Sequence, residues 1–139
     1  MARWYSDADE LIHDPSVTAV YIATPVGSHM EYALRVCKAG KPAYVEKPMA
    51  RSHAECIRMV DAFRAAKLPL FVAYYRRGMP RFVKARELIE SGSIGQVTGV
   101  WYRLAQPRHE KVDPDNLEWR LQVEQSGGGV FMDLGCHTL

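Results

Sequence analysis

Three short apolar segments, the first of them rich in β-branched residues, constrain the fold of this chain more than any other feature. They span residues 17–23, 43–45 and 69–73. Between them lie segments with apolar residues at helical spacing, which begin at Ser28 and Ser52. The nearly continuous apolar run at 17–23 is typical of a strand buried on both faces, as in a parallel sheet. The order strand, helix, strand, helix, strand therefore predicts an α/β fold with a parallel sheet and right-handed crossovers.

Each of the two predicted helices begins with a capping box. The pairs are Ser28 with Glu31 and Ser52 with Glu55. In such a box the serine hydroxyl accepts a hydrogen bond from the backbone N–H three residues on, and the glutamate reaches back to the N–H of the serine. Gly40 ends the first helix, because glycine tolerates the left-handed conformation of a helix terminus.

Polar residues follow all three predicted strands. They are Thr24-Pro25, Glu46-Lys47 and Tyr74-Tyr75-Arg76. Ligands of open parallel sheets bind beyond the carboxyl ends of the strands. The pattern therefore predicts a binding edge before any family is considered.

The character of the chain changes after the third strand. Pro80 opens an amphipathic helix that ends at Ser91-Gly92, since proline is favoured at the first helical position. Residues 96–104 then alternate between two faces with a period of two, which predicts a strand of a different sheet. Residues 106–118 are predicted to be a long loop, and a domain boundary is predicted near residues 92–96.

Composition and charge exclude several classes of protein. The chain has 139 residues, of which 47% are hydrophobic, and a net charge of +2, so it carries no electrostatic footprint for nucleic acid or a membrane surface. It contains no apolar run long enough to span a bilayer, and residues 1–10 lack the apolar segment of a signal peptide, so none is expected. Its three cysteines show no zinc or disulfide spacing. These features predict a cytoplasmic protein with reduced thiols.

Two groups of residues are candidates for chemistry. The first is Glu46-Lys47-Pro48, where a lysine ammonium at a strand end can donate a hydrogen bond to a substrate oxygen. On spacing alone, the favoured interpretation is a surface lysine paired with its neighbouring glutamate, because three residues make a weak motif. The second is Asp133 and His137, which share a face if residues 130–139 form a helix. A carboxylate beside an imidazole favours a general base.

The second group leaves other interpretations open. Asp133 and His137 are also compatible with an ordinary ion pair, or with half of a metal site, although the sequence supplies no assured third ligand. Gly127-Gly128-Gly129 upstream would let the backbone approach a ligand closely, or act as a hinge. His29 faces either a ligand or solvent at the start of its helix. No metal site is predicted.

In their order and spacing these motifs resemble the Gfo/Idh/MocA oxidoreductases. The resemblance rests on Thr24-Pro25, His29, Glu46-Lys47-Pro48, Gly127–Gly129 and Asp133-x-Gly135-x-His137. It implies an NAD or NADP cofactor and a sugar or polyol substrate. The implied cofactor-binding residues are Thr24, Pro25, His29, Glu46, Lys47 and Arg76. The implied catalytic residues are Lys47 near the reacting oxygen, Asp133 on a substrate hydroxyl, and His137 exchanging the proton.

The resemblance also sets an expectation for the domains. Family members begin with a strand and a glycine-rich turn that bind the pyrophosphate, and no residues before Trp4 match them. We therefore expect an internal fragment, with the C-terminal half of a Rossmann-type domain at 1–92. The beginning of an α/β domain with an open antiparallel sheet, which supports homo-oligomers, is expected at 93–139.

Three functions are compatible with these motifs and with the resemblance. The first is a fragment of an NAD(P)-dependent oxidoreductase acting on a sugar, cyclitol or related hydroxyl compound. The second is an NAD-dependent glycoside hydrolase of the same fold, and the third is a truncated, non-catalytic module that dimerises.

Overall fold

A three-stranded parallel sheet forms the centre of the protein. The computed structural model describes residues 3–103, 105 and 116–137. Strands β1 (Val20–Ile22), β2 (Ala43–Val45) and β3 (Leu70–Val72) lie in the order β1-β2-β3. All neighbouring strands run parallel. The predicted α/β order and parallel sheet are therefore confirmed.

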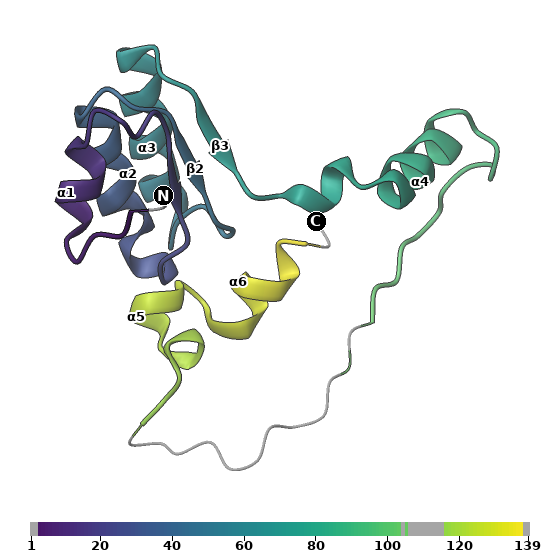
Figure 1. Ribbon diagram of the computed structural model, residues 1–139. Coiled ribbons are helices and arrows are strands. Elements are labelled where there is room, and N and C mark those ends of the chain that lie inside the picture. The colour runs from purple at the N-terminus through teal and green to yellow at the C-terminus, as the bar shows by residue number, and fades with distance from the viewer. Residues whose placement is uncertain (1–2, 104, 106–115, 138–139) are drawn as a thin grey trace.

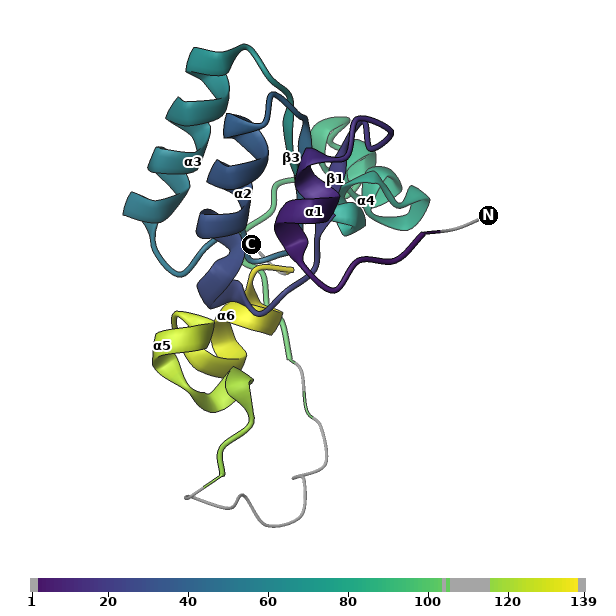
Figure 2. The ribbon, with the colours of Figure 1, turned by 60° about the vertical axis from the view of Figure 1, so that its left-hand side comes forward.

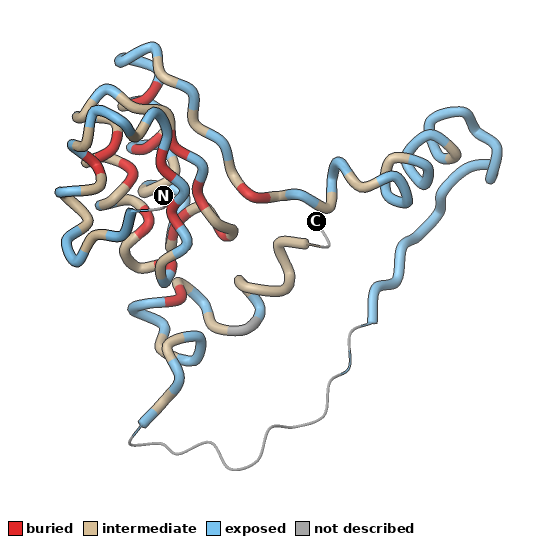
Figure 3. Tube along the Cα trace, viewed as in Figure 1, coloured by how far each residue is buried: buried red, intermediate tan, exposed pale blue. Residues whose placement is uncertain are grey.

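Two helices connect the strands and cover one face of the sheet (Figure 2). They are α2 (His29–Lys38) and α3 (His53–Ala66), and α1 (Ala8–His13) precedes β1. The hydrophobic core lies between these helices and the sheet, where the buried positions cluster in Figure 3. Its members are Ile12, Val20, Ile22, Ala33, Val36, Ala43, Val45, Ala50, Met59 and Phe63. Burial of these apolar side chains is the main stabilising contribution to this part of the chain.

The opposite face of the sheet carries one aromatic residue from each strand. Tyr21, Tyr44 and Phe71 are aligned by the strand register and are 54%, 39% and 58% exposed. The rings of Tyr21 and Tyr44 stack with their centroids 5.2 Å apart. The expectation that the first strand is buried on both faces is therefore wrong for the described residues. Strand side chains alternate between faces, and α2 and α3 cover only one of them.

The capping box at α3 forms in part. The hydroxyl of Ser52 accepts a hydrogen bond from the backbone N–H of Glu55 at 3.3 Å, as predicted. The carboxylate of Glu55 accepts instead from the backbone N–H of Arg51 and from its guanidinium. Arg51 therefore takes the place that the box assigns to the N–H of Ser52.

The capping box predicted at Ser28 is wrong. A 3-10 turn, η1 (Val26–Ser28), leads directly into α2, so Ser28 has helical rather than extended backbone angles. An N-cap side chain reaches the helix N–H groups from an extended conformation. The hydroxyl of Ser28 instead donates to Thr24 Oγ1 at 2.8 Å.

The predicted helix after Pro80 is confirmed, but the strand after it is not. Helix α4 (Pro80–Glu90) follows the 3-10 turn η2 (Tyr75–Gly78) and stands apart from the sheet (Figure 1). The described residues 96–103 are exposed and form no strand. A strand requires a hydrogen-bonded neighbour, and the described part of the chain places none beside them. The antiparallel sheet is therefore not seen there, and most of the predicted loop 106–118 lies outside the described residues.

The last described segment returns to the carboxyl edge of the sheet (Figure 1). It comprises the turn η3 (Trp119–Leu121) and the helices α5 (Val123–Ser126) and α6 (Gly129–Gly135), with α5 packed on η1. Gly127 makes this approach possible. Its φ is +77°, and a Cβ atom there would lie 2.7 Å from Arg51 Cα. Within the described residues, no helix is both long and apolar enough to cross a membrane.

Candidate active site

Lys47 and Asp133 meet at the carboxyl edge of the sheet. Lys47 lies two residues beyond the end of β2, and Asp133 lies in α6. The Nζ atom of Lys47 donates to Asp133 Oδ1 at 2.5 Å and to the main-chain oxygen of Asp133 at 3.0 Å. The two side chains are only 16% and 18% exposed. Two of the three predicted catalytic residues are therefore in direct contact.

Asp133 has a second cationic partner. Arg120, in η3, donates from Nε to Asp133 Oδ2 at 3.2 Å. Burial by itself raises the pKa of Asp133, but the hydrogen bonds and charges of Lys47 and Arg120 outweigh it and lower the pKa below its ordinary value. Asp133 is therefore an ionised carboxylate, able only to accept hydrogen bonds at neutral pH.

His137 lies beyond the end of α6, in a turn. The helix ends at Gly135 with Cys136 as its C-cap, so the predicted placement of Asp133 and His137 on one helical face is wrong. The two side chains share no hydrogen bond among the described contacts, because Lys47 and Arg120 occupy the carboxylate. The His137 ring instead meets Tyr75 edge-on, with centroids 5.6 Å apart.

The environment of His137 favours its neutral form. Burial of the ring is the main cause that lowers its pKa, and the positive charges of Lys47 and Arg76 lower it further. Its Nδ1 atom is buried and has no hydrogen-bond partner among the described residues. A neutral imidazole is suited to accept a proton.

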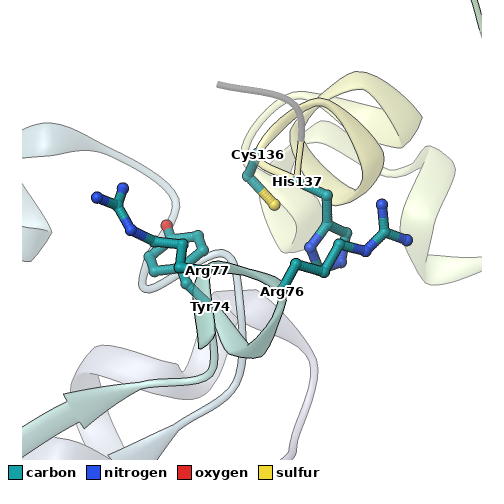
Figure 4. Close-up of a pocket in the computed structure, with 5 residues that line it drawn as sticks. All are labelled: Tyr74, Arg76, Arg77, Cys136 and His137. Carbon is teal, nitrogen blue, oxygen red and sulfur yellow. The ribbon is translucent and has the colours of Figure 1, made fainter. Parts of the chain in front are cut away.

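A cavity of about 240 Å³ opens beside His137 (Figure 4). It is lined by Tyr74, Arg76, Arg77, Cys136 and His137. Arg76 lies next to the imidazole, whereas the guanidinium of Arg77 points away to the other side. Of the predicted cofactor residues, Arg76 is thus the one that lines this cavity.

His29 is buried rather than exposed, with 1% of its surface accessible. Its Nε2 atom lies 2.8 Å from the main-chain oxygen of Thr24, and its Nδ1 atom lies 3.0 Å from that of Pro48. The ring therefore joins the loops that follow β1 and β2. The structure gives His29 a positioning role, and direct contact of His29, Thr24 or Pro25 with a cofactor stays a prediction.

Glu46 faces the aromatic side of the sheet. Its carboxylate accepts hydrogen bonds from the hydroxyl of Tyr21 and, at 3.0 Å, from the backbone N–H of Lys47. The bond to Glu46 raises the pKa of Tyr21 to about 12. The interpretation of Lys47 as a surface residue paired with Glu46 is wrong, since its ammonium is directed to Asp133.

Arg120 and Tyr75 are the site residues that sequence reasoning missed. Arg120 lies next to the segment predicted to be a loop and belongs to no periodic pattern. In the sequence, Tyr75 stands out only as part of a strand end. Both reach the site through the path of the chain, which local patterns do not describe.

Comparison with known proteins identifies the family. Residues 1–74 match the model of an oxidoreductase family with an NAD-binding Rossmann fold, and residues 82–139 match the model of the GFO/IDH/MocA C-terminal domain. The chain belongs to the Gfo/Idh/MocA oxidoreductase family. The resemblance inferred from the motifs is thereby confirmed. The NAD-binding Rossmann fold of this family confirms the prediction of a nicotinamide cofactor. Whether that cofactor is NAD or NADP stays open.

Individual members of the Gfo/Idh/MocA family align along nearly the whole chain. Oxidoreductase P35 of Formosa agariphila is 38% identical over 140 residues, which cover 100% of this chain and 44% of that protein. Levoglucosan dehydrogenase of Pseudarthrobacter phenanthrenivorans is 34% identical over 135 residues, covering 96% and 34%. A structure of levoglucosan dehydrogenase with NADH and levoglucosan superposes with a TM-score of 0.77 at 33% identity, covering 96% and 36%. The chain thus spans less than half the length of these relatives.

The residues at the edge of the sheet fit a nicotinamide dinucleotide and a hydroxyl substrate. The imidazole of His137 lines the cavity, and its buried Nδ1 atom has no hydrogen-bond partner among the described residues. Arg76 contributes a positive charge to the same cavity, which suits an anionic cofactor.

Proposed function

We propose that this protein takes part in hydride transfer between NAD or NADP and a hydroxyl group of a sugar, cyclitol or related polyol. The observation that carries the proposal is the convergence of Lys47, Asp133 and His137 at the carboxyl edge of a parallel sheet. The likeness to levoglucosan dehydrogenase, solved with NADH and levoglucosan, supports a sugar as the substrate class.

The bound nicotinamide would supply the hydride acceptor, and the chain's own residues would handle the hydroxyl group. Lys47 Nζ donates a hydrogen bond to the reacting oxygen. Asp133, being ionised, holds the ammonium of Lys47 and accepts a hydrogen bond from a substrate hydroxyl. The imidazole of His137 takes the hydroxyl proton as the carbon gives up its hydride, which leaves a carbonyl group. In the reverse direction the same imidazole returns the proton.

The remaining features of the whole protein belong to this proposal. They are a boundary near residues 92–96 between a Rossmann-type domain at 1–92 and an α/β domain from 93 onward, and a homo-oligomer formed through the antiparallel sheet of that second domain. The match to the C-terminal domain begins at residue 82, within α4, which supports a change of domain in this region.

The test combines cofactor binding with turnover. NADH and NADPH are titrated by fluorescence, and a panel of sugars and cyclitols is assayed by absorbance at 340 nm. We expect Lys47→Ala and His137→Ala each to lower kcat by about a hundredfold or more, because each removes a proton donor or acceptor from the reacting oxygen. Lys84→Ala, on the exposed face of α4, is the matched control. Normal turnover in both site variants would overturn the proposal.

A further inference from the structure

Arg120 is held from several sides at the edge of the proposed site. Its Nη1 atom donates to Glu118 Oε1 at 2.6 Å, and its guanidinium lies over the ring of Trp119, with Cζ 4.6 Å from the centroid. Its Nε atom donates to Asp133 Oδ2. A guanidinium fixed by a carboxylate and an aromatic face has little freedom to turn.

The two oxygens of Asp133 are divided between two cations. Oδ1 accepts from Lys47 Nζ, and Oδ2 accepts from Arg120 Nε. A carboxylate held in this way cannot rotate about its Cβ–Cγ bond without lengthening one of the two charged hydrogen bonds. Hydrogen bonds between charged groups are the stronger ones in proteins, so this rotation is opposed. The orientation of Oδ1 toward Lys47 therefore depends on Arg120.

The position of the Lys47 ammonium depends on this restraint of Asp133. A lysine ammonium sits on a flexible four-carbon stem and finds its place only through its partners. Within the described part of the chain, both hydrogen bonds of Lys47 Nζ go to Asp133, one to the side chain and one to the main chain. Among the described residues, Glu118, Arg120, Asp133 and Lys47 thus form a row of alternating charges.

We propose that Arg120 is a positioning residue that orients the Asp133 carboxylate and so fixes the ammonium of Lys47 at the reacting oxygen. Its catalytic consequence rests on the proposed function, whereas its effect on Lys47 does not. An arginine serves here because its rigid fork binds Glu118 and Asp133 at once, whereas a lysine offers a single mobile point charge.

The first experiment observes Lys47 directly by NMR. We expect the ¹⁵Nζ signal of Lys47 to be visible, with slowly exchanging protons, in the wild-type chain. In Arg120→Gln this signal is lost to exchange while the amide spectrum of the sheet is retained. Arg120→Lys keeps the charge and restores the signal in part, and it decides the matter if the glutamine variant loses α6. Arg81→Gln, in the exposed α4, leaves the signal unchanged.

The second experiment separates kcat from binding. We expect Arg120→Gln to lower kcat by about tenfold to a hundredfold, since a small displacement of a catalytic group has effects of this size. Its Kd for NADH stays within about twofold. An unchanged Lys47 signal in Arg120→Gln would overturn the proposal, as would an unchanged kcat. Absence of NADH binding and turnover in the wild type would instead refute the proposed function, while the NMR experiment still tests Arg120.

Discussion

The ammonium of Lys47 lies 2.5 Å from a carboxylate oxygen of Asp133, although 86 positions separate the two residues in the chain. This contact ties α6 to the carboxyl end of β2. A second tie is the hydrogen bond from Arg51 Nη1 to the main-chain oxygen of Glu124, at 3.1 Å. The contact between Lys47 and Asp133 therefore both builds the proposed site and helps to hold the last described segment against the sheet.

Loss of the Lys47 ammonium is expected to loosen this segment. Lys47→Met leaves Asp133 largely buried with Arg120 alone, and an incompletely paired buried group costs about 1–3 kcal/mol. We expect a lower free energy of unfolding and faster hydrogen exchange at residues 123–137, measured by urea denaturation and mass spectrometry. Lys84→Met, at an exposed position, is the control. Wild-type exchange rates in Lys47→Met would contradict the prediction.

Gly127 is expected to tolerate no side chain. Gly127 has a positive φ, and a Cβ atom there would lie 2.7 Å from the backbone of Arg51. Gly127→Ala therefore pushes these two backbone segments apart and lowers the free energy of unfolding by about 1–3 kcal/mol. Gly78→Ala is the matched control, because nothing lies within 4 Å of its Cβ position and its φ is ordinary. Thermal unfolding of both variants tests this. Equal stability of the two would show that α5 does not pack closely on Arg51.

Removal of the His29 ring is expected to separate the loops after β1 and β2. His29→Ala leaves a cavity and deprives the main-chain oxygens of Thr24 and Pro48 of their partner, which together cost about 2–4 kcal/mol. His53→Ala, at an exposed position at the start of α3, should change stability little. Chemical denaturation measures both. A His29 variant as stable as the His53 variant would contradict the positioning role.

His137 is expected to make stability depend on pH. Burial is the main cause that lowers its pKa in the folded state, so the unfolded chain binds the proton more tightly. Its contribution is fully present above the unfolded value of about 6.5 and is lost as the pH falls through the folded pKa. We expect the wild type to lose more stability between pH 8 and pH 5 than His137→Gln, measured by urea denaturation. Identical losses would show that the ring is solvated.

Local patterns predicted the elements that depend on neighbouring residues. The three strands and the helices from 29, 53 and 80 all formed, because apolar periodicity and proline act within a few residues of the chain. The serine cap of α3 formed for the same reason. The strand predicted at 96–104 needs a partner strand. The alternation of its side chains indicates only which face each residue would occupy.

The pairing of Asp133 shows where local reasoning ends. A spacing of four residues predicted that it would orient His137, but α6 ends at Gly135 and the carboxylate binds Lys47 and Arg120. The capping box at Ser28 failed similarly, since the turn η1 changed the backbone before the helix began. In both cases a residue had a plausible local partner and found another through the path of the chain.

By itself, the sequence determined the α/β class, the parallel order of the strands, the polar edge and, through its motifs, the family. The tertiary structure decided which charged residues form ion pairs and which polar residues are buried. It paired Lys47 with Asp133, added Arg120, and buried His137 Nδ1 without a hydrogen-bond partner in the described part of the chain. The physical reason is the distance along the chain over which each interaction acts. Backbone hydrogen bonding and side-chain periodicity act over a few residues, whereas desolvation and charge pairing depend on groups that only the folded chain brings together.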